Sequence, residues 1–296
     1  MNRCRVLLLG LLAVGAAAPA WPCTTFCLVD GESIVYGRNF DYYAADGRVM
    51  VNRRGLHKSV FWTNSGLQWV SRFGSLTFNQ FGHEFPNGGI NEAGLVVEHM
   101  MLEGSQYPSD SRPDLTELQW IQYQLDCSAS VEEVLASDQR VRIQSSSTPL
   151  HFLVADRTGR RAVIEFLGGQ MVCHTDSDLP VAALTNNTYD DSIAYAGTTS
   201  PERADHVSSL GRFVQVVASV RNFTRSPAPD PISYAFSALA NVNQPNWTRW
   251  SIVYDIGNLS AYFRTLPAPW IKHIRRCSCH VFHQCVIQFH LHRHRS

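Results

Sequence analysis

The stretch from Cys23 to Asp41 constrains the fold of this chain more than any other. Two apolar segments, Thr25–Val29 and Ser33–Tyr36, are joined through Asp30-Gly31. An Asp-Gly pair between two apolar runs is a strong signal for a β-hairpin. A hairpin here turns the chain back on itself, so the residues that follow the second segment return to its start. We therefore expect Arg38 and Asp41 to lie close to Cys23.

The residues before Cys23 predict a signal peptide, residues 1–22. They have a basic start, an apolar centre and small residues at the end, which is the pattern of an export signal and not of a membrane span. Ala18-Pro19-Ala20 fits a cleavage motif, so Trp21-Pro22 would still precede Cys23 until autoproteolysis or an aminopeptidase removes them. We expect an exported protein, periplasmic or secreted. A lipid-anchored Cys23 is the rival interpretation, but Pro22 is not the small residue that such processing requires.

A cysteine at a new N-terminus carries both a thiol and a free α-amine. The amine titrates near about 8, so it can accept the thiol proton without a histidine. The positive charge of Arg38 would favour the thiolate, and the carboxylate of Asp41 is suited to hold the ammonium. The structural alternative is a surface hairpin with a salt bridge and a cysteine that has no chemical role.

Gly37-Arg38-Asn39-Phe40-Asp41 supplies the motif for a family resemblance. With Cys23 in front of it, this stretch resembles the start of the choloylglycine hydrolase family, the conjugated bile salt hydrolases and penicillin V acylases. These are N-terminal-nucleophile hydrolases in which a cysteine is followed by Gly-Arg-x-x-Asp. Further motifs occur in the family's order: Asn91-Glu92-Ala93-Gly94-Leu95, Thr185-Asn186 and Arg212-Phe213.

The resemblance implies roles for three later residues. The side-chain amide of Asn186 and the backbone N–H of Met101 would bind the oxyanion, and Arg212 would face the active site. The alternatives are an asparagine that holds a turn, a core methionine and a solvated arginine. Tyr42, next to Asp41, is placed to wall an aromatic or acyl pocket.

The implied reaction is hydrolysis of a linear amide C–N bond through a thioester acyl-enzyme, with no metal or organic cofactor. The implied substrates are small molecules such as penicillin V, N-acyl homoserine lactones or conjugated bile salts. Two other functions stay open: an N-terminal-cysteine amidase that acts on lipid amides, and an exported binding protein of the same fold without catalysis.

The family fold is an α+β, four-layer αββα sandwich, and the resemblance covers Cys23–Ile274. A length of 296 residues suits one such domain, and 45% hydrophobic residues suffice for its core. A net charge of +0 argues against a nucleic-acid partner. No apolar run after the leader is long enough to span a bilayer. The resemblance also implies a homo-oligomer, a tetramer.

Local patterns predict individual elements. We expect helices over Asp114–Leu125, from a capping box at Ser130, from Ser200 through Val214, and over Ile232–Val242. The predicted strands are Val49–Asn52, Ser59–Thr63, Gln68–Val70, Ser75–Phe78, Leu150–Asp156, Arg161–Leu167, Gln170–His174, Val181–Leu184, Thr248–Asp255 and Ala261–Arg264.

The last segment, Arg275–Ser296, is crowded with Arg, His and Cys. It predicts a disordered or aberrant tail, and a zinc or copper site is the alternative, although its spacing fits no known zinc module. Three other cysteines remain in the core, Cys27, Cys127 and Cys173. The sequence leaves open whether any two of them form a disulfide.

Overall fold

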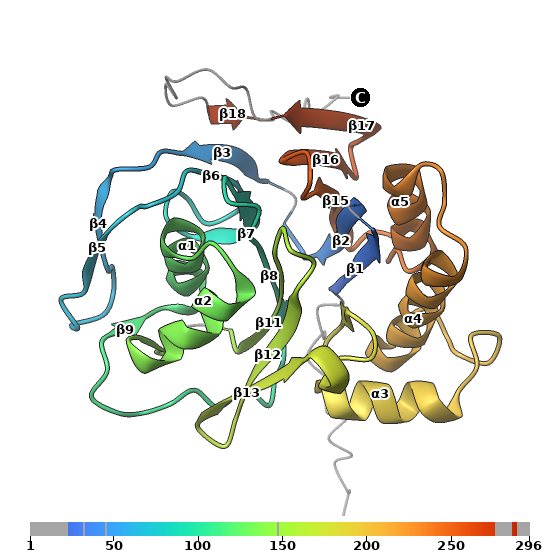
Figure 1. The fold of residues 1–296 in the computed structure, drawn as a ribbon, viewed down its shortest axis with the longest axis horizontal. Coiled ribbons are helices and arrows are strands. Elements are labelled where there is room, and N and C mark those ends of the chain that lie inside the picture. Colours follow the sequence, from blue (N-terminus) through green and yellow to red (C-terminus); the bar gives the residue numbers. More distant parts are fainter. Residues whose placement is uncertain (1–22, 32, 45, 147, 276–285, 289–296) are drawn as a thin grey trace, which may run out of the picture.

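Two antiparallel sheets packed face to face form the centre of the structure, and helices cover the outer face of each (Figure 1). The structure is a computed structural model, and it describes residues 23–31, 33–44, 46–146, 148–275 and 286–288. This arrangement is the predicted α+β, four-layer αββα sandwich.

The smaller sheet has six strands, in the order β14 (Ala183–Leu184), β1 (Thr24–Asp30), β2 (Ser33–Asp41), β15 (Thr248–Asp255), β16 (Ser260–Thr265) and β17 (Ala268–Arg275). The larger has eight, in the order β13 (Gln170–Thr175), β12 (Arg161–Leu167), β11 (Leu150–Ala155), β8 (Val96–Met101), β7 (Pro86–Asn91), β6 (Ser75–Asn79), β3 (Arg48–Asn52) and β18 (Val286–Gln288). Two short pairs complete the strands: β4 (His57–Ser59) with β5 (Gln68–Val70), and β9 (Asp114–Leu115) with β10 (Arg142–Ile143).

The five α-helices divide between the two outer layers, as Figure 1 shows. They are α1 (Glu117–Cys127), α2 (Val131–Ala136), α3 (Tyr189–Thr198), α4 (Ser209–Arg225) and α5 (Pro231–Asn241). Helix α1 packs on β7 and β8 of the larger sheet, whereas α4 and α5 pack on β1 and β2 of the smaller sheet. The active-site hairpin therefore lies inside the molecule, between the helices and the second sheet.

Side-chain alternation along β8 explains the layers. Val96 and Met100 belong to the core shared with the smaller sheet, whereas Val97 belongs to the core beneath α1. Because successive side chains of a strand point to opposite faces, a strand that is apolar on both faces is buried in two cores. Glu98 is a charged residue in this strand and is also fully buried.

Two of the predicted elements are wrong. No helix begins at Ser200: α4 begins at Ser209, and Ser208 caps it by accepting a hydrogen bond from the Gly211 N–H at 3.0 Å. Asp205 accepts hydrogen bonds from the N–H groups of Val207 and Ser208, which forms a turn instead of a helix. Helix α3 was not predicted.

The predicted strand Ser59–Thr63 is also wrong, because β4 ends at Ser59. Trp62 has a φ of 64°, which is a left-handed conformation that no extended strand contains. The other predicted strands and helices occur. Arg161–Leu167 and Thr248–Asp255 match β12 and β15 at both ends, and most of the rest have ends shifted by a few residues. Of these, Gln68–Val70 matches β5 at both ends and Val181–Leu184 shortens to β14.

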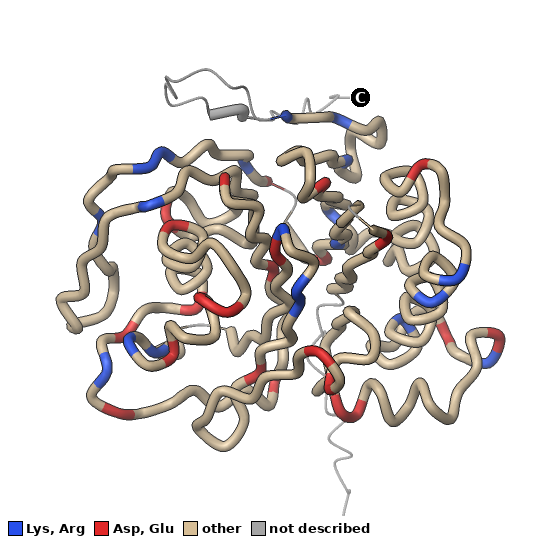
Figure 2. The backbone as a smooth tube through the Cα atoms, in the orientation of Figure 1, with Lys and Arg blue, Asp and Glu red and all other residues tan. Residues whose placement is uncertain are grey.

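The leader, residues 1–22, lies outside the described residues, as does most of the predicted tail. Within that tail the structure describes Arg275, which ends β17, and β18, which pairs with β3. None of the helices in the described ranges is long and apolar enough to cross a membrane. In the view of Figure 2, acidic and basic residues are interspersed along the described chain, in keeping with the net charge of +0.

Candidate active site

The β1–β2 hairpin brings Cys23 next to Asp41. Thr24 pairs with Asn39 across the hairpin, so the residue before β1 lies opposite the end of β2. The Cys23 thiol donates a weak hydrogen bond to the Asp41 backbone carbonyl, with 3.8 Å between sulfur and oxygen. Cys23, Arg38 and Asp41 are all buried. The structure therefore brings together the three residues that the hairpin signal predicted as neighbours.

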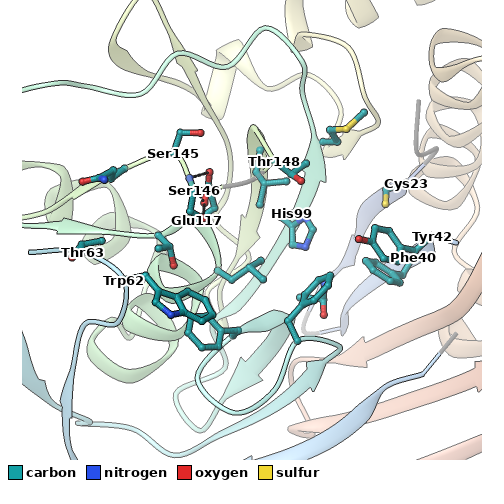
Figure 3. A pocket seen from close by; sticks show the side chains of 18 of the residues that line it. Cys23, Phe40, Tyr42, Trp62, Thr63, His99, Glu117, Ser145, Ser146 and Thr148 are labelled. Carbon is teal, nitrogen blue, oxygen red and sulfur yellow. Dashed lines mark hydrogen bonds between the residues drawn. The ribbon is translucent and has the colours of Figure 1, made fainter. Parts of the chain in front are cut away.

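Cys23 opens onto a cavity of about 560 Å³ between the two sheets (Figure 3). Cys23, Asp41, Tyr42 and Met101 line it, whereas Arg38 does not, and neither do Asn186 and Arg212. The other lining residues are Phe40, Trp62, Thr63, Phe81, Phe85, Asn87, His99, Thr116, Glu117, Leu118, Gln144, Ser145, Ser146, Thr148 and Leu150.

The Cys23 thiol is not activated by Arg38 alone. Burial raises the pKa of Cys23 above its usual range, and the positive charge of Arg38 opposes this only in part. Arg38 forms an ion pair with Glu98 and also donates to the Asn87 carbonyl. Because a carboxylate offsets the charge of Arg38, the thiol stays protonated at neutral pH. A reaction at this thiol would therefore need a base.

Glu98 is a site residue that the sequence analysis missed. Its carboxylate pairs with Arg38 and also accepts a hydrogen bond from the Tyr254 hydroxyl at 2.6 Å. The available signal was a lone carboxylate within an apolar strand, since a buried charge requires a partner. Gly88 on the neighbouring strand makes room for it: a Cβ there would collide with the Glu98 carboxylate, and its φ of 156° is unusual for other residues.

Asp41 has the environment of a carboxylate without its counter-ion. Among the described residues, neither carboxylate oxygen has a hydrogen-bond donor in bonding geometry. Burial raises the pKa of Asp41 to about 7, although Thr248, Arg212 and Arg38 act in the opposite direction. An ammonium group on Cys23, next to Asp41, would supply both the missing charge and the missing hydrogen bonds.

This environment predicts a pH dependence for the chain that still retains Trp21-Pro22. The folded-state pKa of Asp41, about 7, lies above the ordinary 3.8, so folding favours the protonated acid. The free energy of unfolding is therefore highest, as far as Asp41 is concerned, below about pH 4. It falls as the pH rises towards 7, by at most about 4 kcal/mol, because Asp41 must ionise while buried. Asp41→Asn should remove this decrease in stability. Urea unfolding of the unsubstituted protein and of Asp41→Asn between pH 4.5 and 8 measures the difference, and parallel curves of unfolding free energy against pH would contradict the prediction.

Asn186 connects the two sheets next to Cys23. Its side-chain amide donates to the Met101 carbonyl at 2.9 Å, and its oxygen accepts from Arg212 Nη2, also at 2.9 Å. These two contacts fix the orientation of the amide and use one of its two N–H bonds. The second is the candidate oxyanion donor. The Met101 N–H stays a prediction in that role.

Arg212 is buried, which contradicts the alternative of a solvated arginine. It extends from α4, donates through Nε to the Thr24 hydroxyl at 3.1 Å, and places Nη2 3.4 Å from the Cys23 carbonyl. Arg212 therefore holds the backbone at Cys23 and the side chain of Asn186 through one guanidinium. A planar group with five fixed donors is suited to this.

His151 and Glu165 support the same strand end and were also missed. His151 Nε2 lies 2.7 Å from the Thr185 carbonyl, and Nδ1 lies 3.0 Å from Glu165 Oε1. Although burial acts to raise it, hydrogen bonds from His151 and His174 hold the pKa of Glu165 at about 2. Both neighbours of the His151 ring are oxygen atoms, so the ring links the end of β14 to the Glu165 carboxylate.

Tyr42 forms an aromatic wall of the cavity. Its ring stacks on Phe40 with 5.6 Å between centroids and meets Phe81 edge-on at 5.9 Å. Its position matches the expected pocket wall. The remaining cysteines of the described part, Cys27, Cys127 and Cys173, are free thiols.

The comparisons with known proteins agree with this geometry. The model of the family "Linear amide C-N hydrolases, choloylglycine hydrolase family" matches residues 23–198. A penicillin V acylase from Pectobacterium atrosepticum is 25% identical over 309 residues, covering 87% of this chain and 81% of the relative. The structure of a penicillin V acylase from Agrobacterium tumefaciens superimposes with a TM-score of 0.74 at 25% identity, covering 86% of each chain. A variant of the conjugated bile acid hydrolase from Clostridium perfringens has the same fold, with a TM-score of 0.75 at 16% identity, covering 91% of this chain and 97% of that chain.

Proposed function

Because this chain belongs to the choloylglycine hydrolase family and is a linear amide C–N hydrolase, we propose that Cys23 is its nucleophile. In this proposal the residues before Cys23 are removed, and the freed α-amine accepts the thiol proton. The thiolate then attacks the amide carbonyl of the substrate and a tetrahedral oxyanion forms.

The other residues act on this intermediate. The unused N–H of the Asn186 amide and the N–H of Met101 stabilise the oxyanion, and Arg212 keeps the Asn186 amide oriented. The Cys23 ammonium, held by Asp41, protonates the leaving amine, and a thioester remains on the sulfur. The same amine then activates a water molecule, which releases the carboxylic acid.

The observation that carries the proposal is the buried pair formed by the Cys23 thiol and the Asp41 carboxylate. The thiol is protonated without a base, and the carboxylate is buried without a donor among the described residues. One new group, a free α-amine on Cys23, would meet both requirements: the neutral amine accepts the thiol proton, and the ammonium that results donates to Asp41. An unprocessed chain has no such group, so in that form the protein would be an exported binding protein without catalysis.

The cavity supports a substrate with an aromatic or other apolar acyl group. Phe40, Tyr42, Trp62, Phe81 and Phe85 all line it, and aromatic walls favour an aromatic or alkyl group over a charged one. Penicillin V, the substrate in the names of two relatives, carries such a group. We therefore propose a substrate panel of penicillin V, acyl homoserine lactones, conjugated bile salts and lipid amides.

The test compares two forms of the protein. One begins at Cys23, and the other retains Trp21-Pro22 with a blocked amine. We expect hydrolysis of penicillin V, or of another panel member, by the first form alone. Mass spectrometry of the exported protein from cells reports which N-terminus forms and whether residues 1–22 direct export. Equal activity of the form that retains Trp21 would disprove the amine mechanism.

A further inference from the structure

His99 is a buried polar side chain in the wall of the cavity that no step of the proposed mechanism uses. It lies on β8, is 7% exposed and lines the cavity. Among the described residues, neither ring nitrogen has a hydrogen-bond partner. Figure 3 shows its ring between the side of the cavity that holds Cys23 and Tyr42 and the side that holds Ser146.

Two other polar groups of the cavity wall, unlike His99, form hydrogen bonds within the protein. The Glu117 carboxylate accepts from the N–H and the hydroxyl of Ser146, the latter at 2.6 Å. The Asn87 side-chain oxygen accepts from the Gln80 N–H at 2.8 Å. These groups are satisfied by the protein, whereas His99 is not, so His99 is available to a ligand.

The ring of His99 is held as a neutral group. Its ring lies nearly perpendicular to the Phe40 ring, with 6.4 Å between centroids. Burial lowers the pKa of His99 well below its usual range, and the positive charge of Arg38 and the proximity of His151 act in the same direction. A neutral imidazole offers one N–H donor and one lone pair. It therefore suits a hydroxyl, carbonyl or ether oxygen better than a carboxylate.

The occupant of the cavity determines whether these nitrogens gain a partner. Both are buried and have no partner among the described residues, so a plain hydrocarbon beside them leaves a donor and an acceptor unpaired, which is unfavourable. From this we infer that His99 selects acyl groups that carry an oxygen substituent, by hydrogen-bonding that oxygen. The inference rests on the proposed function, since it concerns the acyl group that is transferred to Cys23.

The experiment uses amides of one amine, 2-amino-5-nitrobenzoic acid, with octanoyl, 3-hydroxyoctanoyl, 3-oxooctanoyl and 5-hydroxyoctanoyl groups. For the protein that begins at Cys23, we expect kcat/KM for the best oxygenated substrate to exceed that for octanoyl by about tenfold. His99→Phe, which keeps an aromatic ring against Phe40, reduces this ratio to near one. His99→Gln, which keeps a donor and an acceptor, retains part of it.

Thr116→Val is the matched control. Like the Asp41 carboxylate, the Thr116 hydroxyl is a buried group of the cavity wall without a partner among the described residues, although Thr116 is the N-cap of α1. Valine removes that hydroxyl with little change of shape, and the preference should persist. His99→Leu replaces His99→Phe if the latter is not folded by circular dichroism.

Three results would overturn the role of His99: octanoyl as the best substrate, a preference unchanged in the apolar variants, or a preference abolished by Thr116→Val. A protein that hydrolyses no amide of the panel would instead refute the proposed function. The octanoyl rate of the unmodified protein therefore separates the two failures.

Discussion

Replacing Cys23 with alanine should lower kcat/KM for amide hydrolysis by about 10⁴-fold or more in protein that begins at residue 23. Removal of a nucleophile leaves only binding and oxyanion stabilisation, so the residual rate is small. The fold should survive, because the thiol makes a single weak hydrogen bond, to the Asp41 carbonyl. Steady-state kinetics on the best substrate and a urea unfolding curve measure both effects.

Cys27→Ala is the matched control for this variant. Cys27 is buried in β1, the strand that follows Cys23, and burial raises the pKa of its thiol to about 12. It does not line the cavity, so its loss should affect stability but change kcat/KM by less than about threefold. Loss of activity in Cys27→Ala with retention in Cys23→Ala would reverse the assignment of the nucleophile.

The second large effect is expected at Asn186. Loss of one oxyanion donor typically lowers kcat by about 10² to 10³-fold. Asn186→Asp should produce this loss of kcat, because the carboxylate has no N–H to donate to the oxyanion. KM should change little, because the carboxylate keeps an acceptor for Arg212. Single-turnover acylation rates separate this effect from slow product release.

Asn186→Ala tests whether Asn186 acts only by holding Arg212. Alanine removes both the donor and the partner of the Arg212 guanidinium. If the donor matters, both variants lose activity. If Asn186→Ala is impaired but Asn186→Asp is fully active, Asn186 acts as a support for Arg212 and the oxyanion assignment is wrong. Asn187→Ala, at the next position in the chain, is the control.

The candidate site was predictable where its residues are close along the chain. Asp30-Gly31 located the turn to within one residue, since Asp30 pairs with Ser33, and this was enough to expect Arg38 and Asp41 close to Cys23. The later motifs depended on family resemblance, and the contacts between Asn186, Met101 and Arg212 join three separate elements. No local pattern could have paired them.

The fold shows the same division. Short apolar runs bounded by turn residues predicted strands of both sheets, including β11 and β12 of the larger sheet. The segment from Ser200 to Ser208 contains residues that commonly start a helix. The Asp205 carboxylate instead accepts hydrogen bonds that hold a turn, and the helix begins only after Ser208, which caps it. Side-chain hydrogen bonds of this kind outweigh a weak helix propensity.

By itself, the sequence determined the hairpin and most of the strands, because turn residues and short apolar runs act over a few residues. Tertiary structure alone decided the charge of the site. Glu98 offsets Arg38 across two sheets, and burial keeps the thiol protonated and raises the pKa of Asp41 to about 7. A pKa depends on the solvent and charges around a group, and these are set only when distant segments pack together.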